Sequence, residues 1–213
     1  MERAHRTVQV LPGIHRWSVK DDRIGGMESE AYAVVAEDGA VTLIDPLPID
    51  EKALRKLGRV EAIVLTSGNH QRSAWHFRKL FSAPVWAPEE AHGLEDTPDA
   101  TYGAGANLPG GLVAYHTPGP ALSMYALWLE RPRSVIFLSD LLTHFNNGTP
   151  RFVDNEYQDA PERTRMSIRR ILDHLPIEVL CFAHGRPILH DGASALRRAL
   201  DEDTEAPAPS EPL

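Results

Sequence analysis

Histidines and carboxylates stand where several predicted strands of this chain end, and these residue types bind metal ions or transfer protons. The most polar stretch, Thr66 to Ser73, follows the apolar run 61–65 and reads Thr-Ser-Gly-Asn-His-Gln-Arg-Ser. Single histidines and aspartates end other apolar runs: Asp45, His116, Asp140 and His184. Because strands packed side by side bring their ends to one edge of a sheet, we expect one shared site at that edge.

The elements that would position these side chains begin strand-rich and then alternate. Two short strands are predicted within 7–18, and further strands at 31–36, 40–44, 61–65, 84–87, 112–115, 122–129, 135–138 and 179–182. Helices are predicted at 49–58, from Ala74 to Phe81, at 161–175 and at 193–200, with another first turn at Pro88. Residues 95–110 read as irregular, and a long polar loop spans 145–160. This order predicts a layered α/β fold.

Length and charge limit the classes of function. The 213 residues suffice for one domain with a full core, which we expect over residues 1–200. Five of the acidic residues lie in 201–213, so the net charge of −8 leaves only −3 on the rest. A body without a basic face is a poor match for nucleic acid. The acidic, Pro-rich segment 201–213 is predicted to be a disordered tail.

Cysteine content and hydropathy favour a soluble, cytoplasmic protein. Cys181 is the only cysteine, so no disulfide can form within the chain, and its apolar neighbours predict a buried thiol. No apolar run approaches the roughly 20 residues that cross a bilayer, and no early segment has the pattern of a signal peptide. We therefore expect no membrane partner.

Five motifs in order resemble those of the metallo-β-lactamase superfamily. They are Leu-Ile-Asp45, Val-Leu-Thr66 before a polar loop and helix, His-Thr-Pro-Gly119, Ile-Phe-Leu-Ser-Asp140 and Ala-His184-Gly. The resemblance covers about residues 7–200 and implies a four-layer αββα sandwich of two similar halves. It also implies a dinuclear metal site, built from a His-x-His-x-Asp-His loop after the threonine, a histidine after Pro-Gly, a later aspartate and a last histidine.

Most of the implied ligand positions are substituted in this chain. The positions that lost their ligand are Ser67, Asn69, Gln71, Arg72 and, after the Pro-Gly pair, Pro120. Asp140 and His184 are kept, together with Asp45, to which the resemblance assigns a supporting role. A catalytic zinc needs about three ligands of nitrogen, sulfur or carboxylate type, and a guanidinium offers no lone pair. We therefore predict that the dinuclear site does not assemble and that no cofactor is held.

Three alternatives for the chemistry of this edge stay open. His70, Asp140 and His184 would hold one Zn, Fe or Mn ion, although the resemblance turns the position of His70 away from the metals, which favours an exposed histidine or one at a helix N-terminus. Arg72 would instead replace the metal by pairing with Asp140, held by His184 or Gln71. A serine nucleophile, Ser67 or Ser73, is the third, although the chain has no Gly-x-Ser-x-Gly elbow.

The leading functional hypothesis is a degenerate member of the superfamily that binds a small molecule or a protein through the former pocket. That pocket comprises Ser67, Asn69, His70, Gln71, Arg72, Pro120, Asp140 and His184. The alternative is a hydrolase of an ester, lactone or thioester with one metal ion or an altered metal site. A structural protein that forms a homo-oligomer is the third reading. Metal analysis of the purified protein separates the first two.

Overall fold

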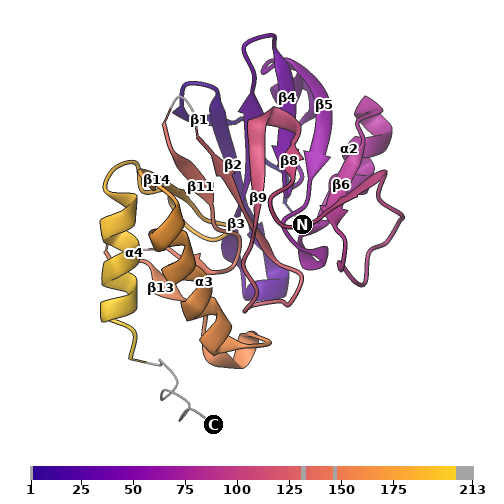
Figure 1. The fold of residues 1–213 in the computed structure, drawn as a ribbon. Coiled ribbons are helices and arrows are strands. Elements are labelled where there is room, and N and C mark those ends of the chain that lie inside the picture. Colours follow the sequence, from indigo (N-terminus) through magenta and orange to yellow (C-terminus); the bar gives the residue numbers. More distant parts are fainter. Residues whose placement is uncertain (1, 131–132, 146–147, 205–213) are drawn as a thin grey trace.

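Two β-sheets packed face to face form the centre of the molecule (Figure 1). The computed structural model describes residues 2–130, 133–145 and 148–204. The first sheet has the order β1 (Val8–Leu11), β2 (Ile14–Asp21), β3 (Met27–Val35), β4 (Ala40–Ile44), β5 (Arg59–Val64), β6 (Val85–Pro88) and β7 (Ala100–Tyr102). The second has the order β14 (Val179–Cys181), β11 (Val135–Phe137), β10 (Tyr125–Leu129), β9 (Leu112–His116) and β8 (Asn107–Leu108).

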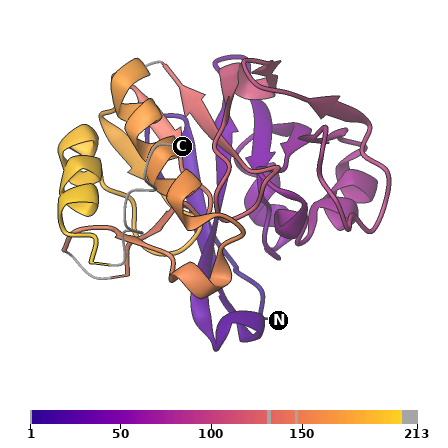
Figure 2. The ribbon, with the colours of Figure 1, turned by 60° about the horizontal axis from the view of Figure 1, so that its bottom comes forward.

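Helices cover the outer face of each sheet, which completes four layers (Figure 2). Helices α1 (Glu51–Arg55) and α2 (Ala74–Phe81) pack their apolar faces on the first sheet, and α3 (Pro161–His174) and α4 (Gly192–Asp201) pack on the second. A third apolar cluster, including Tyr32, Val64, Leu127 and Phe137, fills the space between the sheets. The predicted αββα sandwich is confirmed.

The strand directions bring the predicted site residues to one edge. Strands β4 and β5 are parallel neighbours, as are β11 and β14, so the residues that follow their carboxyl ends lie close together. Strand β3 is antiparallel to β4, so its beginning at Met27 reaches the same edge. The edge is therefore lined from both sheets, as the positions of Asp45, Thr66, Asp140 and His184 predicted.

Several local predictions differ from the structure. The irregular stretch 95–110 contains β7, β8 and part of the 3-10 helix η3 (Pro109–Gly111), because short polar segments pair at the sheet edges without an apolar repeat. Pro88 is the last residue of β6 instead of a helix start. The polar loop after Asp140 holds a small hairpin, β12 (Leu142–Thr143) with β13 (Arg151–Phe152), and the 3-10 helix η4 (Asn155–Tyr157).

The ordered structure runs past the predicted boundary at residue 200. Asp201 ends α4, and Asp203 forms a buried bidentate pair with Arg165 of α3, with oxygen–nitrogen distances of 2.8 and 3.1 Å. This pair fixes the residues after α4 on the domain, which their composition alone did not predict. The rest of the predicted tail, 205–213, lies outside the described residues. Among the helices of the described chain, none combines the length and apolar content of a membrane span.

Candidate metal centre

The loop after β5 turns sharply and directs His70 into the molecule. Ser67 caps the 3-10 helix η2 (Gly68–His70), its hydroxyl accepting a hydrogen bond from the backbone N–H of Asn69 at 3.2 Å. Gly68 lies against the backbone of His92, where a Cβ atom would come within 2.5 Å of a carbonyl oxygen. The tight turn and this close contact fix the direction of the loop, and His70 is only 5% exposed.

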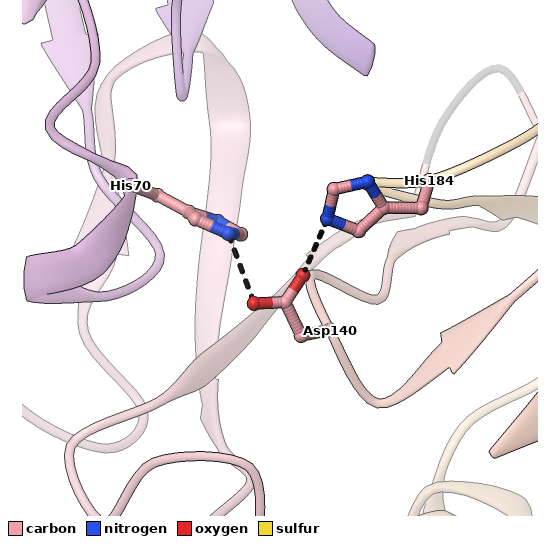
Figure 3. Close-up of side chains that lie close together, drawn as sticks. All are labelled: His70, Asp140 and His184. Atoms are coloured by element: carbon pink, nitrogen blue, oxygen red, sulfur yellow. Dashed lines mark ion pairs between the residues drawn. The ribbon is translucent and has the colours of Figure 1, made fainter. Parts of the chain in front are cut away.

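His70 lies between two carboxylates, which contradicts the prediction of an exposed histidine. Its Nδ1 is 3.0 Å from Asp45 Oδ2. Its Nε2 is 3.0 Å from Asp140 Oδ2, as Figure 3 shows. An ionised carboxylate only accepts hydrogen bonds, so Nδ1 carries a hydrogen. Asp45 also accepts hydrogen bonds from the backbone N–H and the hydroxyl of Thr66, at 2.8 and 2.6 Å. Asp45 therefore fixes both the loop and the imidazole ring.

His184 reaches the other oxygen of the same aspartate. Its Nε2 is 3.2 Å from Asp140 Oδ1 (Figure 3). Its Nδ1 is 3.3 Å from the backbone oxygen of Glu28. The side chain of Asp140 is 23% exposed and that of His184 is 15% exposed, so the cluster opens to solvent on this side. The two halves of the chain therefore meet at Asp140, with His70 from the first and His184 from the second.

The donor set fits one metal ion. Each of His70, Asp140 and His184 offers one ligand atom, and these atoms lie within 4.8 Å of one another. Asp140 Oδ1 is buried without a hydrogen-bond partner and lies 3.2 Å from His184 Nε2, so a lone pair of this oxygen stays available for a cation. In both histidines the other ring nitrogen faces an oxygen acceptor, as is usual in metal-binding histidines.

The charges of the cluster support one another in the metal-free protein. Burial lowers the pKa of His70 and Arg72 adds to this, but the carboxylates of Asp140 and Asp45 outweigh both and raise it to about 9. Burial raises the pKa of Asp140, yet the neighbouring His70 and His184 hold it well below its usual range. Without a metal, His70 is therefore an imidazolium that supplies one positive charge between the two aspartates.

The predicted pair between Arg72 and Asp140 is wrong. The guanidinium of Arg72 donates hydrogen bonds to the backbone oxygens of Glu30 and Asp45, at 2.7 and 3.2 Å, while the ion-pair partners of Asp140 are His70 and His184. The sequence showed a cation and a carboxylate, but the guanidinium donates to backbone oxygens on β3 and directly after β4. Arg72 therefore connects strand ends instead of replacing a metal ion.

Among the hydrogen bonds of the described residues, none joins the hydroxyl of Ser67 or Ser73 to a histidine, and the side chain of Ser73 makes no cap hydrogen bond at the start of α2. The hydroxyl of Ser67 caps η2, and the hydroxyl beside His70 belongs instead to Ser139, whose Oγ is 3.2 Å from Nδ1 and 2.8 Å from Thr66 Oγ1. Ser139 is buried, so it supports the ring and does not face a substrate. This role of Ser139 was not predicted from the sequence, although its position immediately before Asp140 indicated that it lies near the site.

Strained backbone marks the same place. Five non-glycine residues of the described chain have positive φ angles, and three of them belong to this cluster: Asp45 at 45°, Arg72 at 39° and Ser139 at 52°. Such conformations persist only where surrounding contacts hold them, and they concentrate at functional sites. The strain therefore supports the assignment of this edge as the functional site.

The remaining predicted residues surround the cluster without joining it. Asn69 is exposed and lines a groove of about 370 Å³ with Ser67, Gly68, Glu90, His92, Ala121, Leu122, Ser123 and Asp159. The backbone oxygen of Pro120 accepts a hydrogen bond from the backbone N–H of Asp159 at 3.4 Å. His144 faces the backbone oxygens of Arg186 and Gly148. Phe145, at the start of the predicted polar loop, has its ring 6.5 Å from that of His184.

Gln71 holds the neighbouring loop, and its replacement tests this role. Its Nε2 donates to the backbone oxygen of Gly93, and its Oε1 accepts from Trp75 Nε1 and the backbone N–H of Glu95. We expect Gln71→Ala to lower the free energy of unfolding by about 1–2 kcal/mol, because these bonds are lost at a partly exposed site. Urea unfolding measures the loss, and metal affinity should stay unchanged. A stability equal to that of the wild type would show that the loop at 93–95 does not depend on the hydrogen bonds of Gln71.

The family model of the metallo-beta-lactamase superfamily matches residues 7–202, so this chain belongs to that superfamily. No curated protein matches the sequence. Among solved structures, the metallo-β-lactamase DIM-1 is similar with a TM-score of 0.74 at 15% identity, over 94% of this chain and 99% of that one. A metallo-β-lactamase from Pontibacter korlensis gives 0.71 at 17% identity, over 93% and 99%. An archaeal superfamily protein from Sulfolobus tokodaii gives 0.66 at 17% identity, over 87% and 84%. These likenesses concern the fold.

Proposed function

We propose that this protein binds a single divalent transition-metal ion through His70, Asp140 and His184 and hydrolyses a small ester, lactone or thioester. The observation that carries the proposal is the convergence of two imidazole nitrogens on the two oxygens of one aspartate, with Asp140 Oδ1 lacking a hydrogen bond. A metal ion in such a site polarises a carbonyl oxygen and lowers the pKa of a bound water. This choice revises the expectation that no cofactor is held.

The chain's own residues hold this site in shape. Asp45 keeps the Nδ1 of His70 protonated and directs Nε2 toward Asp140. The backbone oxygen of Glu28 faces Nδ1 of His184 in the same way, so that Nε2 of His184 is directed toward Asp140. Two histidines and a carboxylate suit Zn, Fe or Mn, with coordination positions left for water and substrate.

A second metal ion does not fit. The positions where the superfamily places its remaining ligands hold Ser67, Asn69, Gln71, Arg72 and Pro120. Hydroxyl and amide oxygens are weak ligands for these ions, and Gln71 is already used by the loop at 93–95. The permanent charge of Arg72, close to Asp45, adds repulsion. We therefore propose a mononuclear site.

The alternative is a metal-free binding protein, and one observation favours it. With a pKa of about 9, the imidazolium of His70 already supplies a positive charge between Asp45 and Asp140. The groove beside it would then bind a small molecule or a protein segment without turnover. Removal of metal should not change such binding.

Metal content decides between the two proposals. We expect equilibrium dialysis against zinc, iron(II) or manganese(II), followed by elemental analysis, to give one ion per chain. A panel of esters, lactones and thioesters should then show hydrolysis that a chelator removes and added metal restores. Protein that retains no ion at micromolar free metal would overturn the hydrolase and leave the binding protein. Two ions per chain would overturn the mononuclear site.

A further inference from the structure

A second carboxylate lies beneath the cluster, in the space between the two sheets. Glu30 of β3 is only 1% exposed. Its Oε1 accepts a hydrogen bond from Arg16 Nη1 at 2.8 Å, whereas its Oε2 is buried and has no hydrogen-bond partner. A buried carboxylate oxygen without a partner is costly, so this atom calls for a donor.

Glu30 and the groups around His70 line a small cavity. Its volume is about 10 Å³; its polar lining comes from Glu30, Asp45, Thr66 and Ser139, and the rest from Tyr32, Ile44, Phe137, Cys181, Phe182 and Ala183. A polar cavity of about 10–15 Å³ holds one water molecule when it offers two or more hydrogen-bonding groups. The size and the lining therefore match a single internal water.

The directions of the hydroxyl hydrogen bonds in this network leave Ser139 Oγ with a lone pair that can accept a hydrogen bond. Thr66 donates its hydroxyl hydrogen to Asp45 Oδ2, so Ser139, 2.8 Å away, must donate its own hydrogen to Thr66 Oγ1. The oxygen of Ser139 then has a lone pair free to accept. A water that donates one hydrogen to Ser139 Oγ and the other to Glu30 Oε2 satisfies both atoms.

The backbone of Glu30 contacts the loops of both histidine ligands. Its N–H donates to the backbone oxygen of Ala183, next to His184, at 2.7 Å. Its backbone oxygen accepts from Arg72, two residues after His70, also at 2.7 Å. Glu30 is therefore placed to influence the cluster as a whole.

We propose that the cavity holds one ordered water joining Glu30 Oε2 to Ser139 Oγ, and that Glu30 is thereby a positioning residue for the ligand His70. The connection runs from Glu30 through the water to Ser139, then to Thr66, and ends at Asp45, which holds the imidazole ring. The positioning role rests on the proposed metal site. The water itself does not depend on a bound metal.

The charges around Glu30 are consistent with this connection. Burial raises the pKa of Glu30 to about 7, and Glu28 adds to it, while Arg16 and Arg72 act in the opposite direction. The thiol of Cys181 and the phenol of Tyr32 line the cavity too, and burial raises the pKa of each, so both are neutral. A water donating to Oε2 stabilises the carboxylate without adding charge.

A double-mutant cycle on metal affinity tests the connection. We expect Glu30→Gln and Ser139→Ala each to weaken metal binding about tenfold, the lower range for supporting residues around a metal site. Because both interrupt one chain of hydrogen bonds, the double variant should also be about tenfold weaker, instead of about a hundredfold. The matched control is Glu37→Gln, the same change at an exposed turn, which should leave affinity unchanged.

A crystal structure of the metal-free wild type provides the second measurement. It should show a water within hydrogen-bond distance of Glu30 Oε2 and Ser139 Oγ, and that water should be lost in Ser139→Ala. An empty cavity, a Glu30→Gln affinity equal to that of Glu37→Gln, or a hundredfold loss in the double variant would each overturn the proposal. If the wild type binds no metal, the proposed function and the positioning role both fail, while the crystal structure still decides the water.

Discussion

Replacing Asp140 with asparagine should abolish metal binding, with an affinity reduced more than a hundredfold. Changes to supporting residues around metal sites already reduce affinity about 10–100-fold, and Asp140 is the only carboxylate among the three proposed ligands. Asparagine has nearly the same shape but carries no charge, and its amide nitrogen has no lone pair for the ion. Isothermal titration with zinc and manganese(II) measures the change.

The control for this experiment is Asp173→Asn, which removes the same charge from an exposed position on α3. It should bind metal like the wild type. Circular dichroism of both variants establishes that the fold is kept. If Asp140→Asn retained one ion at wild-type affinity, the ion would have to lie elsewhere, and the proposed site at His70, Asp140 and His184 would be wrong.

The metal-free protein should become less stable as the pH rises from about 6.5 to 9. The pKa of His70 is about 9 in the folded state, against a usual value of 6.5. A raised histidine pKa means that the folded state holds the proton more tightly. Its contribution is therefore fully present below pH 6.5 and is lost as the pH passes through 9. The shift corresponds to a contribution on the order of 3 kcal/mol.

Urea unfolding at intervals between pH 6 and 10, in the presence of a chelator, measures this effect. In His70→Gln the fall over this range should disappear, whereas His76→Gln, at an exposed position on α2, should keep it. Glu30 also has a raised pKa, and its contribution is lost at lower pH, between its usual value of 4.5 and about 7. A wild-type stability that stays constant from pH 7 to 9 would mean that His70 is neutral without metal.

Residue types and their order along the chain were enough to predict the fold class and the position of the site. Apolar runs that end in polar residues predicted a layered α/β fold with one shared edge, and the resemblance carried by the five ordered motifs implied the αββα sandwich. The edge could be predicted because strands are marked locally by their apolar residues, and strands packed side by side bring their ends to one edge of a sheet. The loss of most dinuclear ligands was also visible from residue types alone.

Which side chains form the cluster depends on contacts between distant parts of the chain. His70 turns inward because Asp45 and Asp140, 25 and 70 residues away in the chain, provide acceptors for both ring nitrogens. Arg72 turns toward backbone oxygens of β3 and of Asp45, directly after β4, for the same kind of reason. Side-chain direction in a loop follows from distant hydrogen-bond partners and from positive φ angles that residue spacing does not reveal.

Glu30 is the clearest case of a residue whose role is visible only in the folded chain. In the sequence it is one acidic residue in a polar stretch at the start of a predicted strand, with nothing to separate it from Glu28. The packing of the two sheets encloses it beside Asp45, Thr66 and Ser139, and it is this enclosure that leaves Oε2 without a partner. The sequence determined which groups are available, and the contact between the two sheets determined which of them must satisfy one another.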